Sequence, residues 1–254
     1  MARKPFIGGN WKMNTLSSSA LDLASGLAES LKDIDPCKVD VAVCPPSVYL
    51  QTVAKALSSS NISVGAQNVY FEQSGAFTGE LSNEMLKDVG CVYVLIGHSE
   101  RRHVMGESNE LINQKLTAAI NSGLLPILCV GELLEEREAN KTAEVVTEQI
   151  TKGMAGISAE KASSVTIAYE PVWAIGTGLT ATPAQAQETH QMIRQLTEQI
   201  YNADFAGQVR IQYGGSVKPD NAAELSAQPD IDGFLVGGAS LKVDDFVAII
   251  KAAV

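Results

Sequence analysis

The chain has 254 residues, of which 45% are hydrophobic and 19% are charged, as is usual for a globular protein with a full hydrophobic core. Its formal net charge of −10 argues against binding to nucleic acid or to an anionic membrane, although a local lysine or backbone N–H groups could still hold a small anionic substrate. The apolar runs are no longer than strands, and no long apolar segment follows the basic residues 1–5, so neither a transmembrane helix nor a signal peptide is expected.

The cysteines form no Cys-x-x-Cys pair, and the sequence shows no cluster of metal ligands. Three of the four lie in or beside apolar runs, where buried, reduced thiols are usual. Reduced thiols suit the cytosol, so a cytoplasmic protein is expected. The cysteines are Cys37, Cys44, Cys91 and Cys129.

Short apolar strands alternate with amphipathic helices along the whole chain. Strands are predicted at residues 6–10, 39–44, 62–67, 92–97, 124–130, 165–170, 209–213 and 233–236. Helices are predicted at residues 17–31, 47–57, 109–122, 142–152, 183–201 and 243–252, with shorter ones near 81–87 and 221–225. This alternation predicts an α/β protein with a closed (β/α)₈ TIM barrel, eight parallel strands ringed by helices, as a single domain over residues 1–254.

A doubly wound open sheet is the alternative to the barrel. Such sheets usually begin with a glycine-rich nucleotide-binding motif, and neither GxGxxG nor GxxxxGK[ST] occurs in the chain. A barrel collects its functional residues at the C-terminal ends of its strands. In chain order these ends carry Asn10 and Lys12, Gln67, His98 and Glu100, Glu132, Glu170, Gly214-Gly215-Ser216 and Gly237-Gly238.

Lys12 follows the first predicted strand. A lysine among apolar neighbours at a barrel mouth can neutralise an anion, or can form a Schiff base if its pKa is lowered. A solvated lysine with neither role is the alternative.

The long connection at residues 68–80 carries three aromatic residues and shows neither helical nor strand periodicity. Loops of this length in compact domains are usually functional, and exposed aromatic side chains are typical of partner surfaces. An interface is therefore predicted here, and a loop folded onto its own barrel is the alternative.

His98 follows the fourth strand and precedes Ser99-Glu100-Arg101. A histidine in this place can polarise a carbonyl group or carry a proton. If Ser99 opens a short helix, the helix dipole lowers the pKa of His98 and favours the neutral ring. A hydrogen-bonded structural histidine is the alternative. The other histidines, His103 and His190, are expected at the surface.

Residues 168–178 join a strand-end carboxylate, Glu170, to an apolar loop with glycine hinges. Pro171 removes a backbone donor and ends strand pairing. The sequence Thr182-Pro183-Ala184-Gln185 then has the form of a helix start, with a capping box. These features predict a lid that excludes water above a general base whose pKa is raised by partial burial. The alternative is a carboxylate that caps a helix or pairs with an arginine. The loop residues concerned are Trp173, Ile175, Gly176 and Gly178.

Two glycine pairs, Gly214-Gly215 and Gly237-Gly238, follow the last two strands. Glycine lets a backbone approach a ligand closely, and successive N–H groups bind anions. Because many barrels bind phosphate at this place, a phosphate site is predicted, whereas a single Gly-Gly is usually only a turn.

Segments spread over nearly the whole chain resemble the triosephosphate isomerase family, in the order in which the family has them. They are Gly9-Asn10-Trp11-Lys12-Met13-Asn14, Gly97-His98-Ser99-Glu100-Arg101-Arg102, Cys129-Val130-Gly131-Glu132, residues 168–178, Tyr213-Gly214-Gly215-Ser216-Val217 and Leu235-Val236-Gly237-Gly238-Ala239-Ser240. The resemblance implies the interconversion of dihydroxyacetone phosphate and D-glyceraldehyde 3-phosphate through an enediolate, in glycolysis and gluconeogenesis, without a cofactor or metal.

The resemblance also implies a role for each residue of the site. Glu170 moves the proton, neutral His98 donates to the carbonyl oxygens, Lys12 offsets negative charge, Asn10 helps to polarise the carbonyl group, and Glu100 lies behind Lys12 and His98. The phosphate is held by backbone N–H groups of Gly176, Ser216, Gly237 and Gly238. The lid and the clamp that dries the base are formed by Pro171, Trp173, Ile175 and Leu235.

Members of the family insert the long third loop into a second subunit, so the resemblance implies a homodimer. Thr78 then approaches Asn10 and Lys12 of the other copy, and Glu80 pairs with its Arg101. One departure is visible, since Leu179 stands where many relatives carry lysine at the trailing hinge of the lid.

Three other functions are compatible with the individual residues. A glycosidase could use Glu170 with Glu132 or Glu100, although 6% aromatic residues offer few platforms for sugar rings. An aldolase could form a Schiff base at Lys12, which borohydride would trap. A non-catalytic barrel could bind a phosphorylated ligand without turnover.

Overall fold

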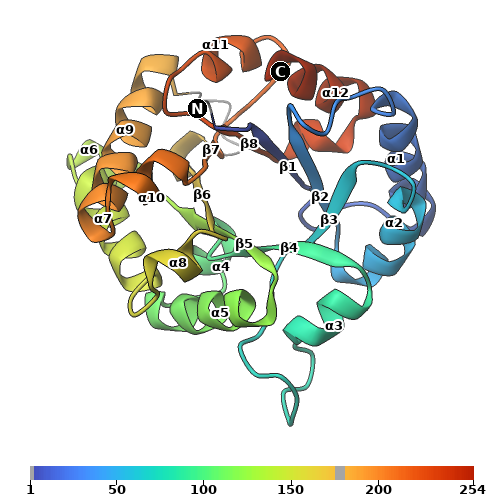
Figure 1. Cartoon of the computed structure of the whole chain (residues 1–254), viewed down its shortest axis with the longest axis horizontal. Coiled ribbons are helices and arrows are strands. Elements are labelled where there is room, and N and C mark those ends of the chain that lie inside the picture. The colour runs from blue at the N-terminus through green and yellow to red at the C-terminus, as the bar shows by residue number, and fades with distance from the viewer. Residues whose placement is uncertain (1–2, 175–180) are drawn as a thin grey trace.

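The computed structural model, which describes residues 3–174 and 181–254, is a closed barrel of eight parallel strands ringed by helices (Figure 1). The strands are β1 Phe6–Asn10, β2 Asp40–Cys44, β3 Ile62–Ala66, β4 Cys91–Ile96, β5 Leu125–Val130, β6 Thr166–Tyr169, β7 Ile211–Tyr213 and β8 Gly233–Val236. Each strand pairs with the next, and β1 also pairs with β8, with Phe6 opposite both Asp40 and Gly233. The predicted barrel is therefore confirmed, and each strand lies within two residues of its predicted ends.

The helices surround the barrel and connect successive strands. They are α1 Ser17–Ser30, α2 Leu50–Leu57, α3 Asn83–Asp88, α4 Ser99–His103, α5 Asn109–Ser122, α6 Leu134–Glu138, α7 Thr142–Gly153, α8 Ala159–Ala162, α9 Pro183–Ile200, α10 Ala203–Gln208, α11 Ala222–Ser226 and α12 Val243–Ala252, with 3₁₀ turns η1 Ser47–Tyr49, η2 Val172–Ala174 and η3 Gly238–Leu241. The predicted helices are all present, although the one at residues 47–57 begins with η1. The helices α6, α8 and α10 were not predicted, because a segment of four to six residues is too short to show a helical period.

Two hydrophobic clusters account for the alternation of side chains along the strands. The larger cluster joins strand residues such as Ile7 to helix residues such as Leu27, so it lies between the sheet and the helices. The buried residues of the smaller cluster all come from strands, including Phe6, Leu95 and Ile127, and they fill the inside of the barrel. Neighbours such as Phe6 and Ile7 thus face opposite sides of the sheet.

The start of α9 has the predicted capping box. The Thr182 hydroxyl accepts from the N–H of Gln185 at 3.2 Å, and the Thr182 N–H donates to the Gln185 side chain at 2.9 Å. Pro183 occupies the first turn. This cap fixes where the chain after the predicted lid re-enters regular structure. Among the helices of the described chain, none is both long and apolar enough to cross a membrane.

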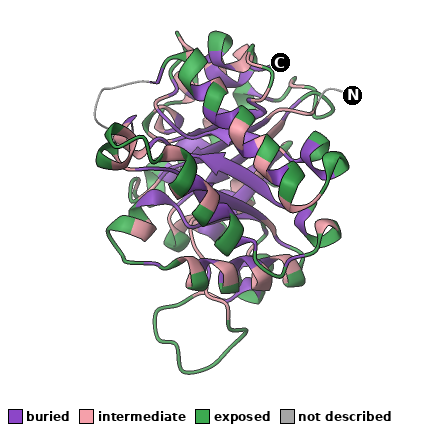
Figure 2. Cartoon of the chain, turned by 90° about the vertical axis from the view of Figure 1, so that its left-hand side faces the viewer, coloured by how far each residue is buried: buried purple, intermediate pink, exposed green. Residues whose placement is uncertain are grey.

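The loop between β3 and α3 projects away from the barrel (Figures 1 and 2). Residues 72–80 are all exposed, and the main contacts within the loop are those of Tyr70 with Phe71 and Phe77, whose ring centroids lie 4.3 and 4.9 Å from that of Tyr70. The alternative of a loop folded onto its own barrel is therefore wrong.

One of the two histidines expected at the surface is instead in the core. His103 is exposed, but His190 on α9 is fully buried. Its ring packs edge-on against Tyr169 with centroids 5.7 Å apart, and its Nδ1 lies 3.2 Å from the carbonyl oxygen of Asp230. The expectation failed because the buried face of α9 includes polar residues. Of the four free cysteines, all but the exposed Cys37 are buried, as predicted.

Candidate active site

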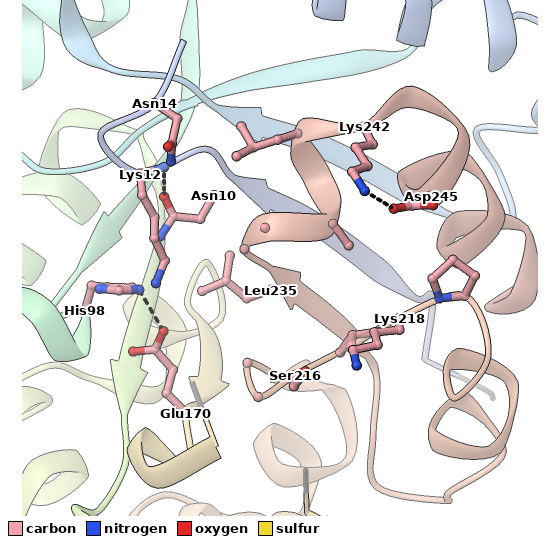
Figure 3. A pocket seen from close by; sticks show the side chains of 18 of the residues that line it. Asn10, Lys12, Asn14, His98, Glu170, Ser216, Lys218, Leu235, Lys242 and Asp245 are labelled. Atoms are coloured by element: carbon pink, nitrogen blue, oxygen red, sulfur yellow. Dashed lines mark hydrogen bonds and ion pairs between the residues drawn. The ribbon is translucent and has the colours of Figure 1, made fainter. Parts of the chain in front are cut away.

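A pocket of about 820 Å³ opens at the C-terminal ends of the strands (Figure 3). It brings together most of the residues predicted for the site, from both halves of the chain. The predicted residues among those that line it are Asn10, Lys12, His98, Glu170, Gly214, Gly215, Ser216, Leu235, Gly237 and Gly238. The pocket is also lined by Asn14, Val217, Lys218, Lys242 and Asp245, to which no role was predicted. Asn14 and Val217 belong to the quoted motifs, whereas no motif marks Lys218, Lys242 or Asp245.

Glu170 and His98 meet at the floor of this pocket, and both are almost fully buried. The Nε2 atom of His98 lies 3.0 Å from Oε1 of Glu170 (Figure 3). The other carboxylate oxygen, Oε2, accepts a hydrogen bond from the backbone N–H of Ser99 at 3.0 Å. Ser99 opens α4, so the predicted helix after His98 also supplies a ligand for the carboxylate.

The contacts of the His98 ring assign its tautomer. Nδ1 accepts a hydrogen bond from the backbone N–H of Glu100 at 3.2 Å, so this atom carries no proton. The ring proton is then on Nε2, which donates it to Glu170. The predicted lowering of the His98 pKa is wrong for this arrangement. Burial lowers this pKa, but the charge of Glu170 and its hydrogen bond raise it, and the net shift is upward.

The pKa of Glu170 is also shifted against expectation. Burial raises it, as predicted, but the hydrogen bond from His98, the N–H of Ser99 and the charge of Lys12 all lower it. The net shift of the Glu170 pKa is downward, because the carboxylate accepts hydrogen bonds from donors inside the pocket. The apolar neighbours in the sequence could not show this, since the donors come from elements far away along the chain.

Lys12 is held in an unusual backbone conformation at the mouth of the barrel, with φ of +52°. Its N–H donates to the Asn10 side chain at 3.0 Å, and its carbonyl oxygen accepts from the Gln67 amide at 2.8 Å. Gln67 also donates to the carbonyl oxygen of Cys44 at 2.8 Å, so this strand-end residue, which had no predicted role, ties β2 and β3 to Lys12. The Lys12 ammonium pairs with Glu100 at 2.7 Å. This ion pair uses the charged amine, whereas a Schiff base needs the neutral one.

The glycine pairs lie where backbone passes close to the catalytic candidates. A methyl group on Gly214 would lie 2.8 Å from Cγ of Glu170, so only glycine fits there without displacing the side chain. Gly237 precedes η3 and faces Lys12, whose Cε would be 3.5 Å from such a methyl group. Ser216, Gly237 and Gly238 border the same pocket as Lys12 and Glu170, so backbone N–H groups and a cation are available to one anion.

Comparison with known proteins decides between the possible functions of this pocket. The model of the triosephosphate isomerase family matches residues 5–253. The chain belongs to the triosephosphate isomerase family. It is 59% identical to the triosephosphate isomerase of Carboxydothermus hydrogenoformans over 99% of this chain and 100% of that one. It is 52% identical to that of Rhodopirellula baltica and 53% identical to that of Clostridium acetobutylicum, over 98% or more of each chain.

The protein is thus an isomerase that interconverts dihydroxyacetone phosphate and D-glyceraldehyde 3-phosphate, a reaction of glycolysis and gluconeogenesis. The glycosidase, aldolase and non-catalytic alternatives are set aside. No three His, Cys, Asp or Glu side chains in residues 3–174 and 181–254 are grouped so as to hold a metal ion.

Glu132, considered above as a possible glycosidase carboxylate, instead holds the segment that follows Glu170 through hydrogen bonds. It is fully buried and accepts hydrogen bonds from the Tyr169 hydroxyl at 3.1 Å and from Nε1 of Trp173 at 2.9 Å. The guanidinium of Arg137 donates to Glu132 at 3.1 Å and stacks 4.8 Å above the Trp173 ring. Pro171 is buried. Four further residues predicted for the lid lie outside the described residues, namely Ile175, Gly176, Gly178 and Leu179.

The residues predicted for a subunit interface are in two places. Thr78 and Glu80 are exposed on the projecting loop. Arg101, on α4, donates to Glu107 of the same chain at 2.6 Å, with 30% of its side chain exposed. A second cavity, of about 380 Å³, lies between the loop and α4, and Lys12, Glu80 and Arg101 are among the residues that line it.

Proposed function

We propose that Glu170 is the base of this isomerase and moves the proton between the two carbons of the triose phosphate, while His98 donates to the two carbonyl oxygens in turn. The observation that carries this proposal is the meeting of the two side chains, 3.0 Å apart, in a pocket that also contains Lys12. A base and an acid within hydrogen-bond reach of each other can both reach one small substrate. Since they now bind each other, the substrate has to separate them, which releases Glu170 from the donor that lowers its pKa.

In this proposal Lys12 offsets the negative charge of the substrate and of the enediolate. Asn10 helps to polarise the carbonyl group, and Glu100 orients Lys12 from behind. The supports are the 2.7 Å ion pair between Lys12 and Glu100 and the 3.0 Å hydrogen bond between the Lys12 N–H and Asn10. Glu100 also lies 3.6 Å from Nδ1 of His98, so one carboxylate sits beside both polar groups.

We assign the phosphate group of the substrate to the backbone N–H groups of Ser216, Gly237 and Gly238, with Gly176 as a further donor. Ser216 lies across the pocket from His98 (Figure 3), and Gly237 and Gly238 line the same pocket. For the lid, we propose that Pro171, Trp173 and Ile175 move with it, and that Ile175 and Leu235 enclose the base. Exclusion of water then strengthens the interactions of the charged groups and protects the enediolate.

The test is a coupled assay for dihydroxyacetone phosphate formed from D-glyceraldehyde 3-phosphate. We expect Glu170→Ala to lower turnover by at least about 10² to 10⁴, the usual loss with a general base. Glu135→Ala, which removes an exposed carboxylate, is the control and should turn over normally. Undiminished turnover in Glu170→Ala would show that another group is the base.

We propose that two copies of the chain associate through the loop at residues 68–80. Besides the loop, large apolar side chains are exposed at or next to the residues that line the second cavity. Met13, 96% exposed, and Met105, 64% exposed, line it, and Val48, 77% exposed, follows its lining residue Ser47. Such a surface is typical of an interface, and a second copy of the chain is the occupant that the family implies. Light scattering should give twice the chain mass of 26.9 kDa, and a monomer mass would refute the dimer.

We also propose a cytoplasmic location and a single domain over residues 1–254. The buried, reduced cysteines support the first, and the pairing of β1 with β8, which ties both ends of the chain into one sheet, supports the second. Cell fractionation and a single unfolding transition would check them.

A further inference from the structure

We propose that Gln149, on α7, is a positioning residue for Glu170. Its side-chain amide forms two hydrogen bonds with one residue, Gly131, directly after β5. Nε2 donates to the Gly131 carbonyl oxygen at 3.0 Å, and the Gly131 N–H donates to Oε1 at 2.8 Å. Gln149 is 7% exposed and lines neither of the two cavities described above, so it acts on the site only through other residues.

The peptide group bonded to Gln149 also forms a hydrogen bond with the backbone of Glu170. The N–H of Gly131 and the carbonyl group of Val130 belong to one trans peptide and point in opposite directions. The N–H donates to Gln149, while the Val130 carbonyl oxygen accepts from the Glu170 N–H at 2.7 Å. One residue further on, the carbonyl oxygen of Glu132 accepts from the N–H of Val172 at 3.1 Å. Gln149 therefore fixes the peptide plane whose carbonyl oxygen accepts from the Glu170 N–H, and it holds the residue directly before Glu132, whose carbonyl oxygen accepts from Val172.

Gly131 packs directly against the backbone of Glu170, so a movement of Gly131 is transmitted to the proposed base. A methyl group on Gly131 would lie 1.7 Å from the carbonyl oxygen of Glu170, so the two backbones are in direct contact. Glycine has the least restricted backbone of any residue, and a glycine at this place needs an external restraint. The Gln149 amide supplies it by satisfying both polar groups of Gly131, which would be costly to bury unpaired.

The inference rests on the proposed role of Glu170, and it predicts a specific effect on the kinetics. Displacing a base by a fraction of an ångström slows proton transfer without weakening a phosphate contact elsewhere in the pocket. Loss of the Gln149 amide should therefore lower kcat and leave KM nearly unchanged. It should also raise the primary isotope effect measured with substrate deuterated at the transferred position, because proton transfer becomes a larger part of the overall rate.

The first variant is Gln149→Met, which keeps the length of the side chain and removes both hydrogen bonds. Its matched control is Gln187→Met on α9. Gln187 also binds one residue twice, since it donates to the Asp230 carboxylate at 2.6 Å and accepts from the Asp230 N–H at 3.1 Å, but it lies remote from the pocket. We expect kcat to fall by about 10-fold or more in Gln149→Met, with KM within about twofold, and to stay at the wild-type value in Gln187→Met.

A second variant, Gln149→Glu, keeps the inference testable if Gln149→Met does not fold. A protonated glutamic acid has the shape of glutamine, so it can accept from the Gly131 N–H and donate to the Gly131 carbonyl oxygen. The ionised form can only accept, and it repels that oxygen. Turnover of Gln149→Glu relative to wild type should therefore be near normal at acidic pH and should fall as pH rises.

Equal kcat values for Gln149→Met and Gln187→Met, or a flat pH ratio for Gln149→Glu, would overturn the inference. If the proposed function is wrong instead, Glu170→Ala will retain turnover, which distinguishes the two failures. If Glu170→Ala is inactive and Gln149→Met is fully active, only the positioning role is wrong.

Discussion

Gly214 lies against the side chain of Glu170 so closely that a methyl group at position 214 would be 2.8 Å from Cγ of Glu170 and 3.2 Å from the carbonyl oxygen of Tyr169. Gly214 is itself fixed, since its N–H donates to that carbonyl oxygen at 2.7 Å. The glycine pair after β7 therefore does more than line the proposed phosphate site. It also forms one wall of the space in which the base sits.

Gly214→Ala should therefore push Glu170 out of place and lower kcat by roughly 10²-fold, the loss expected from displacing a reacting group by about 1 Å. The control is Gly207→Ala in α10, where a methyl group would meet nothing within 4 Å and kcat should not change. Steady-state kinetics on the two variants make the comparison. An unchanged kcat in Gly214→Ala would mean that the base is not confined on this side.

His98→Ala should move the acid limb of the pH profile as well as slow the reaction. His98 lowers the pKa of Glu170 through the hydrogen bond that its Nε2 donates, so removing the ring lets burial raise that pKa. A base with a higher pKa loses activity at higher pH, and the acid limb of kcat/KM should shift upward. The expected fall in kcat is about 10² to 10⁴. His103→Ala, which changes an exposed ring, serves as the control, and an unmoved acid limb in His98→Ala would contradict the assigned contact.

His190 should make the isomerase less stable in acid. Burial lowers its pKa from 6.5 to about 3, so between these values the unfolded chain takes up a proton that the folded chain does not. The free energy of unfolding must then fall as pH falls through this range. We expect the stability advantage of wild type over His190→Gln to shrink by about 1 kcal/mol between pH 6 and pH 5. Urea unfolding at one fixed protein concentration measures it, and a constant difference would show that the folded ring takes up a proton as readily as the unfolded one.

Phe77→Asp should weaken the proposed dimer. Phe77 is 38% exposed on the projecting loop, and a charge there opposes burial against a second copy. We expect the dissociation constant of the dimer to rise by at least about 10-fold, the equivalent of about 1.4 kcal/mol. Val254→Asp, which alters an apolar residue exposed at 56% at the C-terminus, is the matched control. Sedimentation velocity over a range of concentrations gives the dissociation constant of each variant. Equal constants for Phe77→Asp and Val254→Asp would place the interface elsewhere.

Much of the fold could be predicted because its signals are local. The helices α5 and α12 and the strands β1 and β8 have the predicted bounds, since hydrophobic periodicity and turn residues are properties of short segments. The cap of α9 could be predicted for the same reason, because Thr182 and Gln185 are close together in the sequence. The burial of His190 could not be predicted, because whether a polar residue faces the core depends on what packs against its helix.

The catalytic candidates were recognisable because they stand at the ends of strands in short motifs, and a parallel barrel brings all such ends to one face. For this reason one pocket contains Glu170, His98, Lys12 and the glycine pairs. The direction of each pKa shift was decided only in three dimensions. The carboxylate of Glu170 meets His98 and also Ser99, 71 residues away, and these donors together with the charge of Lys12 outweigh the effect of burial on the Glu170 pKa.

The sequence by itself determined the order of strands and helices, the residue types at the barrel mouth and the family to which they correspond. The tertiary structure alone decided the contacts among them: Arg101 with Glu107, Gln67 with Lys12, and Gln149 with Gly131. The reason is physical. Periodicity and capping act over a few residues, whereas a side chain in the closed barrel takes its partners and its surroundings from segments that only folding brings together.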